Sequence, residues 1–260
     1  MGHKRYGYLP KSKIWREIVN SLGDYSLGNA EISSIAQNTL RNVQSQYSNL
    51  RNDPSINASF EFLVQVSLAF QKNDPLKYLS ENKIIDKEEL SLLRLARGAT
   101  KYKSDEVASH EYQTFARQAA IDAINNWYKS NIERGRSLFS EGIDSTAIFR
   151  KAANGTGFCE LSRLYFSKLT ERYLKYFLER EASTKISNVN ERERFSREIE
   201  KKVDEISKHA FETAKITESF SAGWYYNHVK DELPKENEIR NFLTTSFGKM
   251  KSELLREEAK

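Results

Sequence analysis

The stretch FCELSRLYFSKLTERYLKYFLERE, residues 158–181, decides the fold class of this chain. Its apolar side chains recur at intervals of three and four residues, which is the spacing of one face of an α-helix. These positions are Phe158, Leu161, Tyr165, Leu169, Tyr173, Tyr176 and Phe177. Arginines, lysines and four glutamates fill the remaining faces. The stretch therefore predicts a long amphipathic helix whose aromatic face, with Tyr165 and Leu169, lies in a hydrophobic core.

The same helical spacing recurs on both sides of this stretch. Residues 60–70 are apolar nearly all round, which predicts a central core helix, and Asn-Asp-Pro at residues 52–54 supplies a cap for it. The charged segment at residues 189–220 has apolar positions close to a heptad repeat, which predicts a helical hairpin or coiled-coil-like packing. Because glycine and proline are scarce, at 11 and 4 residues, long uninterrupted helices are favoured. We expect an all-α multi-helix bundle of about eight to ten helices, with an extended basic N-terminal arm.

Composition suggests a boundary near the middle of the chain, since residues 98–108 are polar and include Gly98. We expect residues 1–105 to form the basic arm and an N-terminal helical half. Residues 106–260 are expected to form a bundle of longer helices. One continuous domain is the alternative.

The net charge of the chain lies in its first sixteen residues. Five cations and no acid occur before Glu17, whereas residues 17–260 carry 36 charges of each sign. Positive charges interleaved with flat aromatic rings suit contact with phosphates and stacking on bases. The arm residues that we expect to bind nucleic acid are Lys4, Arg5, Tyr6, Tyr8, Lys11, Lys13 and Arg16. Docking to an acidic protein and a solvated tail without a partner are the alternatives.

A second basic island begins within a helix predicted over residues 87–97, for which Asp86 and Glu89 resemble a capping box. No acid lies between the cations of the island, which suggests a further contact with nucleic acid. Cations near a helix C-terminus are also favoured by the helix dipole alone. The island consists of Arg94, Arg97, Lys101 and Lys103.

Sequence motifs for catalysis and metal binding are missing. The four histidines show neither the His-Glu-x-x-His spacing of zinc proteases nor the Glu-x-x-His pairs of di-iron bundles. Gly-Thr-Gly at residues 155–157 lacks the lysine of a P-loop, so we expect a turn between two helices there. The aromatic run at residues 224–226 is expected to close the end of a bundle, with base stacking as the alternative. We therefore expect a protein that is not an enzyme, with no catalytic residues, no metal site and no cofactor.

The single cysteine, Cys159, allows no intramolecular disulfide and is expected in the core, and no apolar signal segment opens the chain. We expect a cytoplasmic bacterial protein that has no membrane partner. The leading expectation is a non-enzymatic helical subunit of a larger assembly that contacts nucleic acid, DNA or RNA, and other protein subunits. The alternative is a protein–protein adaptor, for example in antiviral (phage) defence, that makes no nucleic-acid contact.

Overall fold

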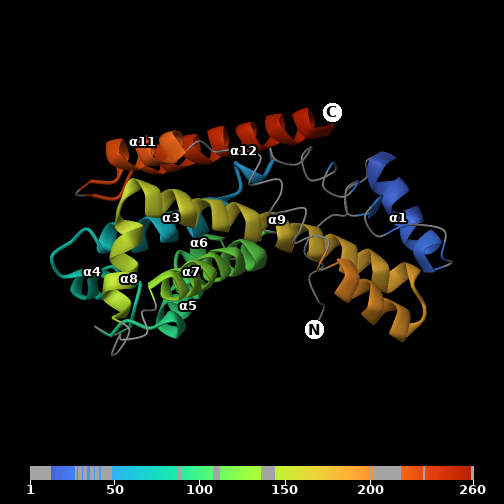
Figure 1. Ribbon diagram of the computed structural model, residues 1–260, viewed down its shortest axis with the longest axis horizontal. Coiled ribbons are helices and arrows are strands. Elements are labelled where there is room, and N and C mark those ends of the chain that lie inside the picture. The colour runs from blue at the N-terminus through green and yellow to red at the C-terminus, as the bar shows by residue number, and fades with distance from the viewer. Residues whose placement is uncertain are drawn as a thin grey trace.

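Every element of the computed structural model is helical over the residues that it describes (Figure 1). The described residues are 13–26, 28, 31, 34–35, 38, 41, 49–86, 89–107, 112–135, 144–199, 201, 218–230 and 232–258. The eleven bounded helices of this part of the chain are α1 (Lys13–Ser26), α3 (Pro54–Ala69), α4 (Pro75–Glu81), α5 (Leu92–Lys101), α6 (Ser104–Val107), α7 (Gln113–Gly135), α8 (Ser145–Arg150), the 3-10 helix η1 (Lys151–Ala153), α9 (Gly155–Lys185), α11 (Glu218–His228) and α12 (Glu236–Glu258). Residues 189–199 are helical as well. The all-α prediction is thus confirmed for the described residues, with slightly more helices than expected.

Helix α9 is the axis of the molecule. It runs along the longest dimension in Figure 1, with α11 and α12 above it and α7 below it in that view. Its 31 residues span about 46 Å at a rise of 1.5 Å per residue. It contacts α1, α3, α7, α11 and η1. The predicted amphipathic helix is therefore confirmed, and both Tyr165 and Leu169 are buried.

Helices α7 and α9 pack antiparallel, and ion pairs join their edges. Arg172 of α9 donates from Nε to Asp122 Oδ2 of α7 at 2.7 Å, and its Nη2 lies 2.6 Å from the same oxygen. Near the end of α7, Arg134 Nη1 donates to Glu160 Oε1, near the start of α9, at 3.0 Å. A later residue of α7 is thus paired with an earlier residue of α9, which is the order that antiparallel packing requires.

Helix α3 lies in the core along almost its whole length, as its apolar sequence predicted. Asp53 caps it, because its Oδ1 accepts from the backbone N–H groups of the second and third helical residues at 2.8 and 3.2 Å. The ring of Phe60 meets rings from two other helices. Its centroid lies 5.7 Å from that of Phe166 in α9 and 5.2 Å from that of Phe242 in α12. The core is therefore assembled where α3, α9 and α12 meet.

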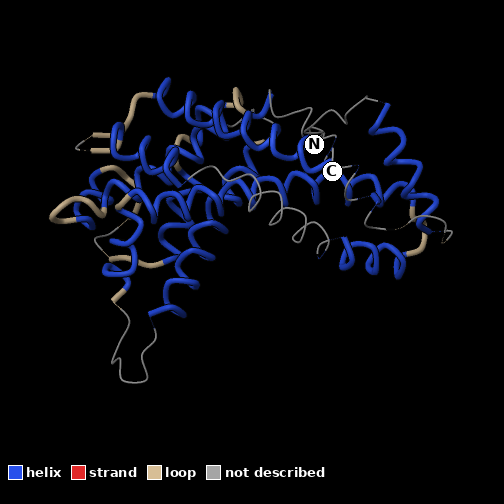
Figure 2. Tube along the Cα trace, turned by 45° about the horizontal axis from the view of Figure 1, so that its top comes forward, coloured by secondary structure: helices blue, strands red, loops and turns tan. Residues whose placement is uncertain are grey.

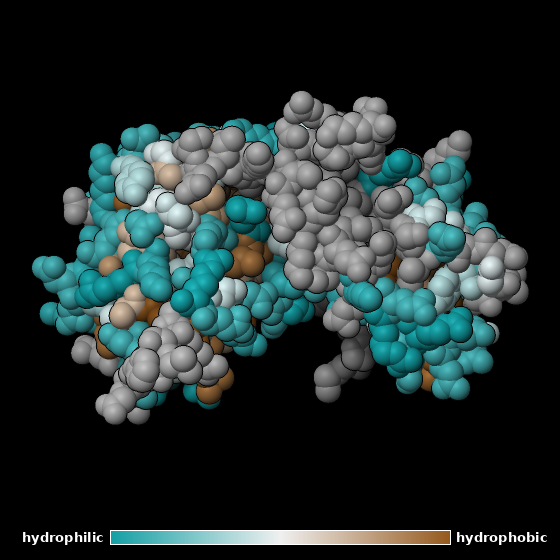
Figure 3. Space-filling view, viewed as in Figure 1, coloured by the Kyte–Doolittle hydropathy of each residue, from teal (hydrophilic) through white to brown (hydrophobic). Residues whose placement is uncertain are grey.

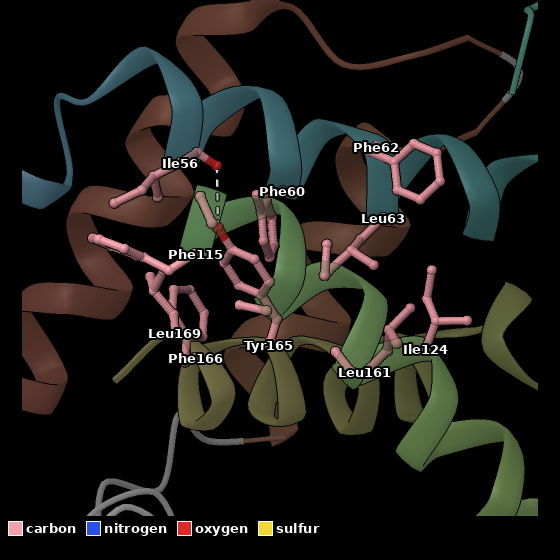
Figure 4. Packing of buried hydrophobic residues seen from close by; sticks show 14 of the residues in the cluster. Ile56, Phe60, Phe62, Leu63, Phe115, Ile124, Leu161, Tyr165, Phe166 and Leu169 are labelled. Carbon is pink, nitrogen blue, oxygen red and sulfur yellow. Dashed lines mark hydrogen bonds between the residues drawn. The ribbon is translucent and has the colours of Figure 1, made fainter. Parts of the chain in front are cut away.

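Tyr165 shows how this core accommodates a polar group. Its ring is fully buried among apolar side chains from several helices (Figure 4). Its hydroxyl lies 2.7 Å from Ser59 Oγ and donates to the carbonyl oxygen of Ile56 at 3.3 Å. Burial raises the pKa of this phenol well above its ordinary value. Tyr165 thus acts as a neutral hydrogen-bonded link between α9 and α3.

The end of the molecule opposite α4 consists of α1, the last turns of α9 and the helix at residues 189–199 (Figures 1 and 2). Its buried side chains include Ile18, Leu22, Tyr25, Phe195 and Ile199. The rings of Tyr25 and Phe195 meet edge to face with centroids 5.2 Å apart. The predicted apolar stripe is therefore confirmed at residues 195 and 199. Residues 202–217, which belong to the predicted hairpin, lie outside the described part of the chain.

One hydrophobic cluster extends from Ile18 of α1 to Met250 of α12. Across the predicted boundary at residue 105, α3 contacts α7, α9 and α12. Gly98 lies inside α5, and a Cβ atom there would be 1.9 Å from the carbonyl oxygen of Ile84. This glycine lets α5 approach the preceding connection and does not mark a linker. The division into residues 1–105 and 106–260 stays a prediction.

Candidate nucleic-acid interface

The arm meets the described part of the molecule at α1. Five of its predicted contact residues lie outside the described part of the chain: Lys4, Arg5, Tyr6, Tyr8 and Lys11. Lys13 is the first residue of α1, and the side chain of Arg16 is exposed one turn later. For the arm, the structure therefore fixes the point of attachment and the position of Arg16.

Helix α1 is anchored by a polar clasp as well as by apolar packing. The hydroxyl of Tyr25 donates to Glu198 Oε2 at 2.7 Å, and the guanidinium of Arg194 lies over the Tyr25 ring, 5.7 Å from its centroid. Burial, and next the hydrogen bond to Glu198, raises the pKa of Tyr25. The arm thus emerges from a helix fixed to the helix at residues 189–199.

The fold pairs two of the four cations of the second island with acids and takes Lys103 away from the other three. Arg94 points to acids of the connection that precedes α5: its guanidinium donates to Asp86 Oδ1, and its Nη2 lies 2.8 Å from Glu89 Oε2. The side chain of Arg94 is 18 % exposed, and two carboxylates accept from it. The predicted capping box is wrong, because α5 begins at Leu92 and Ser91 caps it. Asp86 and Glu89 bind a side chain of the helix instead of its N-terminus.

Lys103 is drawn inward by a buried carboxylate. Its Nζ donates to Glu61 Oε2 at 2.7 Å, and the Tyr102 hydroxyl donates to Glu61 Oε1 at 2.6 Å. The Glu61 side chain is only 6 % exposed. Lys103 adopts a φ of 46°, a left-handed conformation that is unfavourable for a lysine, so the pairing holds a strained residue in place. Burial raises the pKa of Tyr102 strongly, and the Glu61 charge adds to the effect.

Arg97 and Lys101 remain on the surface of α5. Helices α1 and α5 lie toward opposite ends of the long axis in both Figure 1 and Figure 2. The described cations of α5 therefore do not adjoin Arg16 of α1. Nucleic-acid contact stays a prediction for all four island residues. The sequence contains one sign of the pairing between Glu61 and Lys103. A lone carboxylate in an apolar helix requires a partner.

The glycines at the start of α9 serve packing. Asn154 caps α9, because its side chain accepts from the backbone N–H of Gly157 at 3.0 Å. A Cβ atom at Gly157 would lie 1.8 Å from the carbonyl oxygen of Lys151, and one at Gly155 would lie 2.7 Å from the Ala222 Cβ. The predicted turn at residues 155–157 is wrong, because α9 already begins at Gly155 and Asn154 alone separates it from η1. The close contacts explain why both positions are glycine.

The aromatic run at residues 224–226 is mainly structural. Tyr225 is buried, and its hydroxyl lies 2.8 Å from Ser67 Oγ and accepts from Gln71 Nε2 at 2.8 Å. Trp224 stacks on His228, whose Nδ1 lies 3.1 Å from Glu238 Oε1 of α12. These contacts join α11 to α3 and α12, as expected of side chains that close a bundle, whereas Tyr226 is 58 % exposed.

Other kinds of site find little support in the described part of the chain. Among the described residues, no group of three or more His, Cys, Asp or Glu side chains could hold a metal ion. None of the described helices combines the length and the apolarity needed to cross a bilayer. Cys159 is buried, as predicted. On the face shown in Figure 3, hydrophilic side chains cover most of the described surface and hydrophobic atoms are scattered.

Comparison with protein-family models, curated proteins and solved structures found no match to this chain.

Proposed function

We propose that this protein is a non-enzymatic helical subunit that contacts nucleic acid through its N-terminal arm. The observation that carries the proposal is the segregation of charge: the whole net charge of +5 lies in residues 1–16, and the remaining chain is balanced. Polyanions attract such a segment over the Debye length and release counterions when they bind it. The body then serves as a scaffold for the arm and for other protein subunits.

The anchoring of α1 supports this proposal. Ile18, Leu22 and Tyr25 are buried, while Arg16 is exposed on the same helix. The helix therefore uses one face for packing and keeps at least one cation in water. A basic segment held at one end by a packed helix loses less freedom on binding than a segment without such an anchor.

The salt dependence of binding to duplex DNA tests the proposal. Five phosphate contacts predict a slope of log affinity against log salt of about −4.5, from roughly −0.9 per contact. The charge reversal R5E/K11E/K13E should abolish most of this slope. The matched control is R150E/R163E/K235E, which changes the net charge equally at three exposed cations of the body. Equal losses in the two variants would show that total charge, and not the arm, drives binding.

A protein–protein adaptor is the second candidate. The pairing of Arg94 and Lys103 with acids of the same chain favours it, because fewer body cations then remain for phosphates. An adaptor would bind neither duplex nor single-stranded nucleic acid at low salt, and a defined protein partner would purify with it. In that case the arm reversal should release the partner and leave the melting temperature unchanged.

A further inference from the structure

The outward face of α5 carries three cations in register. Arg94, Arg97 and Lys101 are spaced by three and four residues, so they lie along one side of the helix. Leu95 and Ala99 are buried on another side. Lys103 does not belong to this face, because the buried carboxylate of Glu61 holds it.

The connection before α5 supplies two acids that pair with Arg94 of this face. Asp86 and Glu89 both accept hydrogen bonds from the Arg94 guanidinium. The two carboxylates are themselves 51 % and 71 % exposed, whereas Arg94 is 18 % exposed. Hydrogen bonding from Arg94 lowers the pKa of Asp86, and the nearby charge of Arg97 adds a smaller effect. Two of the three cations thus act on Asp86.

We propose that this face of α5 is a second phosphate-binding surface, which Asp86 and Glu89 hold in a self-paired, autoinhibited state. The proposal rests on the proposed nucleic-acid function and adds a regulated contact to it. Both carboxylates are exposed to water, which solvates them when they separate from Arg94, so releasing the acids costs little. A phosphate chain can therefore take the place of the acids at Arg94 while it contacts Arg97 and Lys101. Glu61 could not be displaced in this way, since its buried charge would lose its partner.

Neutralising the two acids tests the proposal. D86N/E89Q should bind single-stranded oligo(dT) more tightly than wild type, and its salt slope should be steeper by about 0.7 for each additional phosphate that the protein binds. The matched control is D105N/E106Q, which removes two exposed acids of α6 and changes the net charge equally. Fluorescence anisotropy over a salt series measures both slopes, and circular dichroism checks that each variant is folded. Tighter binding by D86N/E89Q alone supports the proposal, and an equal effect in both variants or no effect overturns it.

Repeating the comparison of D86N/E89Q with D105N/E106Q in the R5E/K11E/K13E background separates the effect of α5 from that of the arm. The tighter binding of D86N/E89Q should persist there, and adding R94Q/R97Q/K101Q should abolish it. If arm reversal leaves wild-type binding unchanged, the proposed function of the arm fails, yet the difference between D86N/E89Q and D105N/E106Q still decides the present proposal. Tighter binding that survives R94Q/R97Q/K101Q would overturn it, because the freed cations would not be its source.

Discussion

Glu61 is an acidic side chain in a helix that is otherwise packed into the core, and its charge determines the position of Lys103. A buried carboxylate is tolerated only where hydrogen bonds and an opposite charge replace its hydration. Tyr102 and Lys103 supply both, at 2.6 and 2.7 Å. At the scale of single residues, electrostatics inside the fold therefore competes with any ligand for the same cation.

The variant K103M should lower the free energy of unfolding by about 3 kcal/mol, the lower end for a broken buried pair, because Lys103 is partly exposed. E61M/K103M removes both charges and should recover most of the loss. Urea unfolding of the two variants and wild type measures this. A K103M protein as stable as wild type would mean that water reaches Glu61 and solvates it.

A second buried acid, Glu181 of α9, predicts a pH dependence. Burial raises its pKa above the ordinary value of 4.5, with smaller opposing effects from Arg180 and Lys185. A carboxyl whose pKa is higher in the folded state stabilises the fold below pH 4.5, and this contribution is lost as the pH rises toward the folded pKa. E181Q should therefore melt at a higher temperature than wild type at pH 7, and the difference should vanish near pH 4. Identical melting curves at pH 7 would contradict the assignment.

At the scale of elements, close approach between segments determines where glycine is required. Gly157 in the first turn of α9 lies against the Lys151 carbonyl, whereas a Cβ atom at Gly248 of α12 would meet nothing within 4 Å. Both glycines lie within helices, where alanine has the higher intrinsic propensity. The surroundings of each glycine therefore decide whether its replacement by alanine raises or lowers the free energy of unfolding.

G157A should lower the free energy of unfolding by about 1–3 kcal/mol or more, because backbone must move to admit the methyl group. G248A should raise it by about 0.8–1 kcal/mol through helix propensity. Thermal and urea unfolding of the pair provide the measurement. If both variants were stabilised, the start of α9 would have to be more open than the structure shows.

Local signals in the sequence predicted most helices, because caps and apolar stripes depend on near neighbours. Asp53 is an example, since its cap involves only the next few residues. The pairing of Arg94 was missed for a related reason. Asp86 and Glu89 have the spacing of a capping box, and sequence alone does not distinguish a carboxylate that binds backbone from one that binds a guanidinium. Glu61 and Lys103 are 42 residues apart, so only the fold brings them together.

At the scale of the whole molecule, the basic arm and the packed body are separate in their chemistry. Deleting residues 1–11 removes three of the five cations, and it leaves Lys13 and Arg16, which belong to α1. We expect the truncated protein to keep its melting temperature, because the buried side chains that anchor α1 remain, and to lose its affinity for duplex DNA. Calorimetry and anisotropy measure the two properties on one sample. A drop of many degrees in melting temperature would assign the arm to the fold.

The clasp between α1 and the helix at residues 189–199 has a consequence for synthesis of the chain. Tyr25 and Glu198 are 173 residues apart. At roughly 5–20 residues per second, the ribosome needs on the order of ten seconds or more to supply the second partner after the first. During that time the apolar face of α1 is without the surface that later covers it, beside the most basic segment of the chain. The apolar face of the nascent α1 therefore stays accessible to ribosomal RNA and chaperones until residues 189–199 have been synthesised.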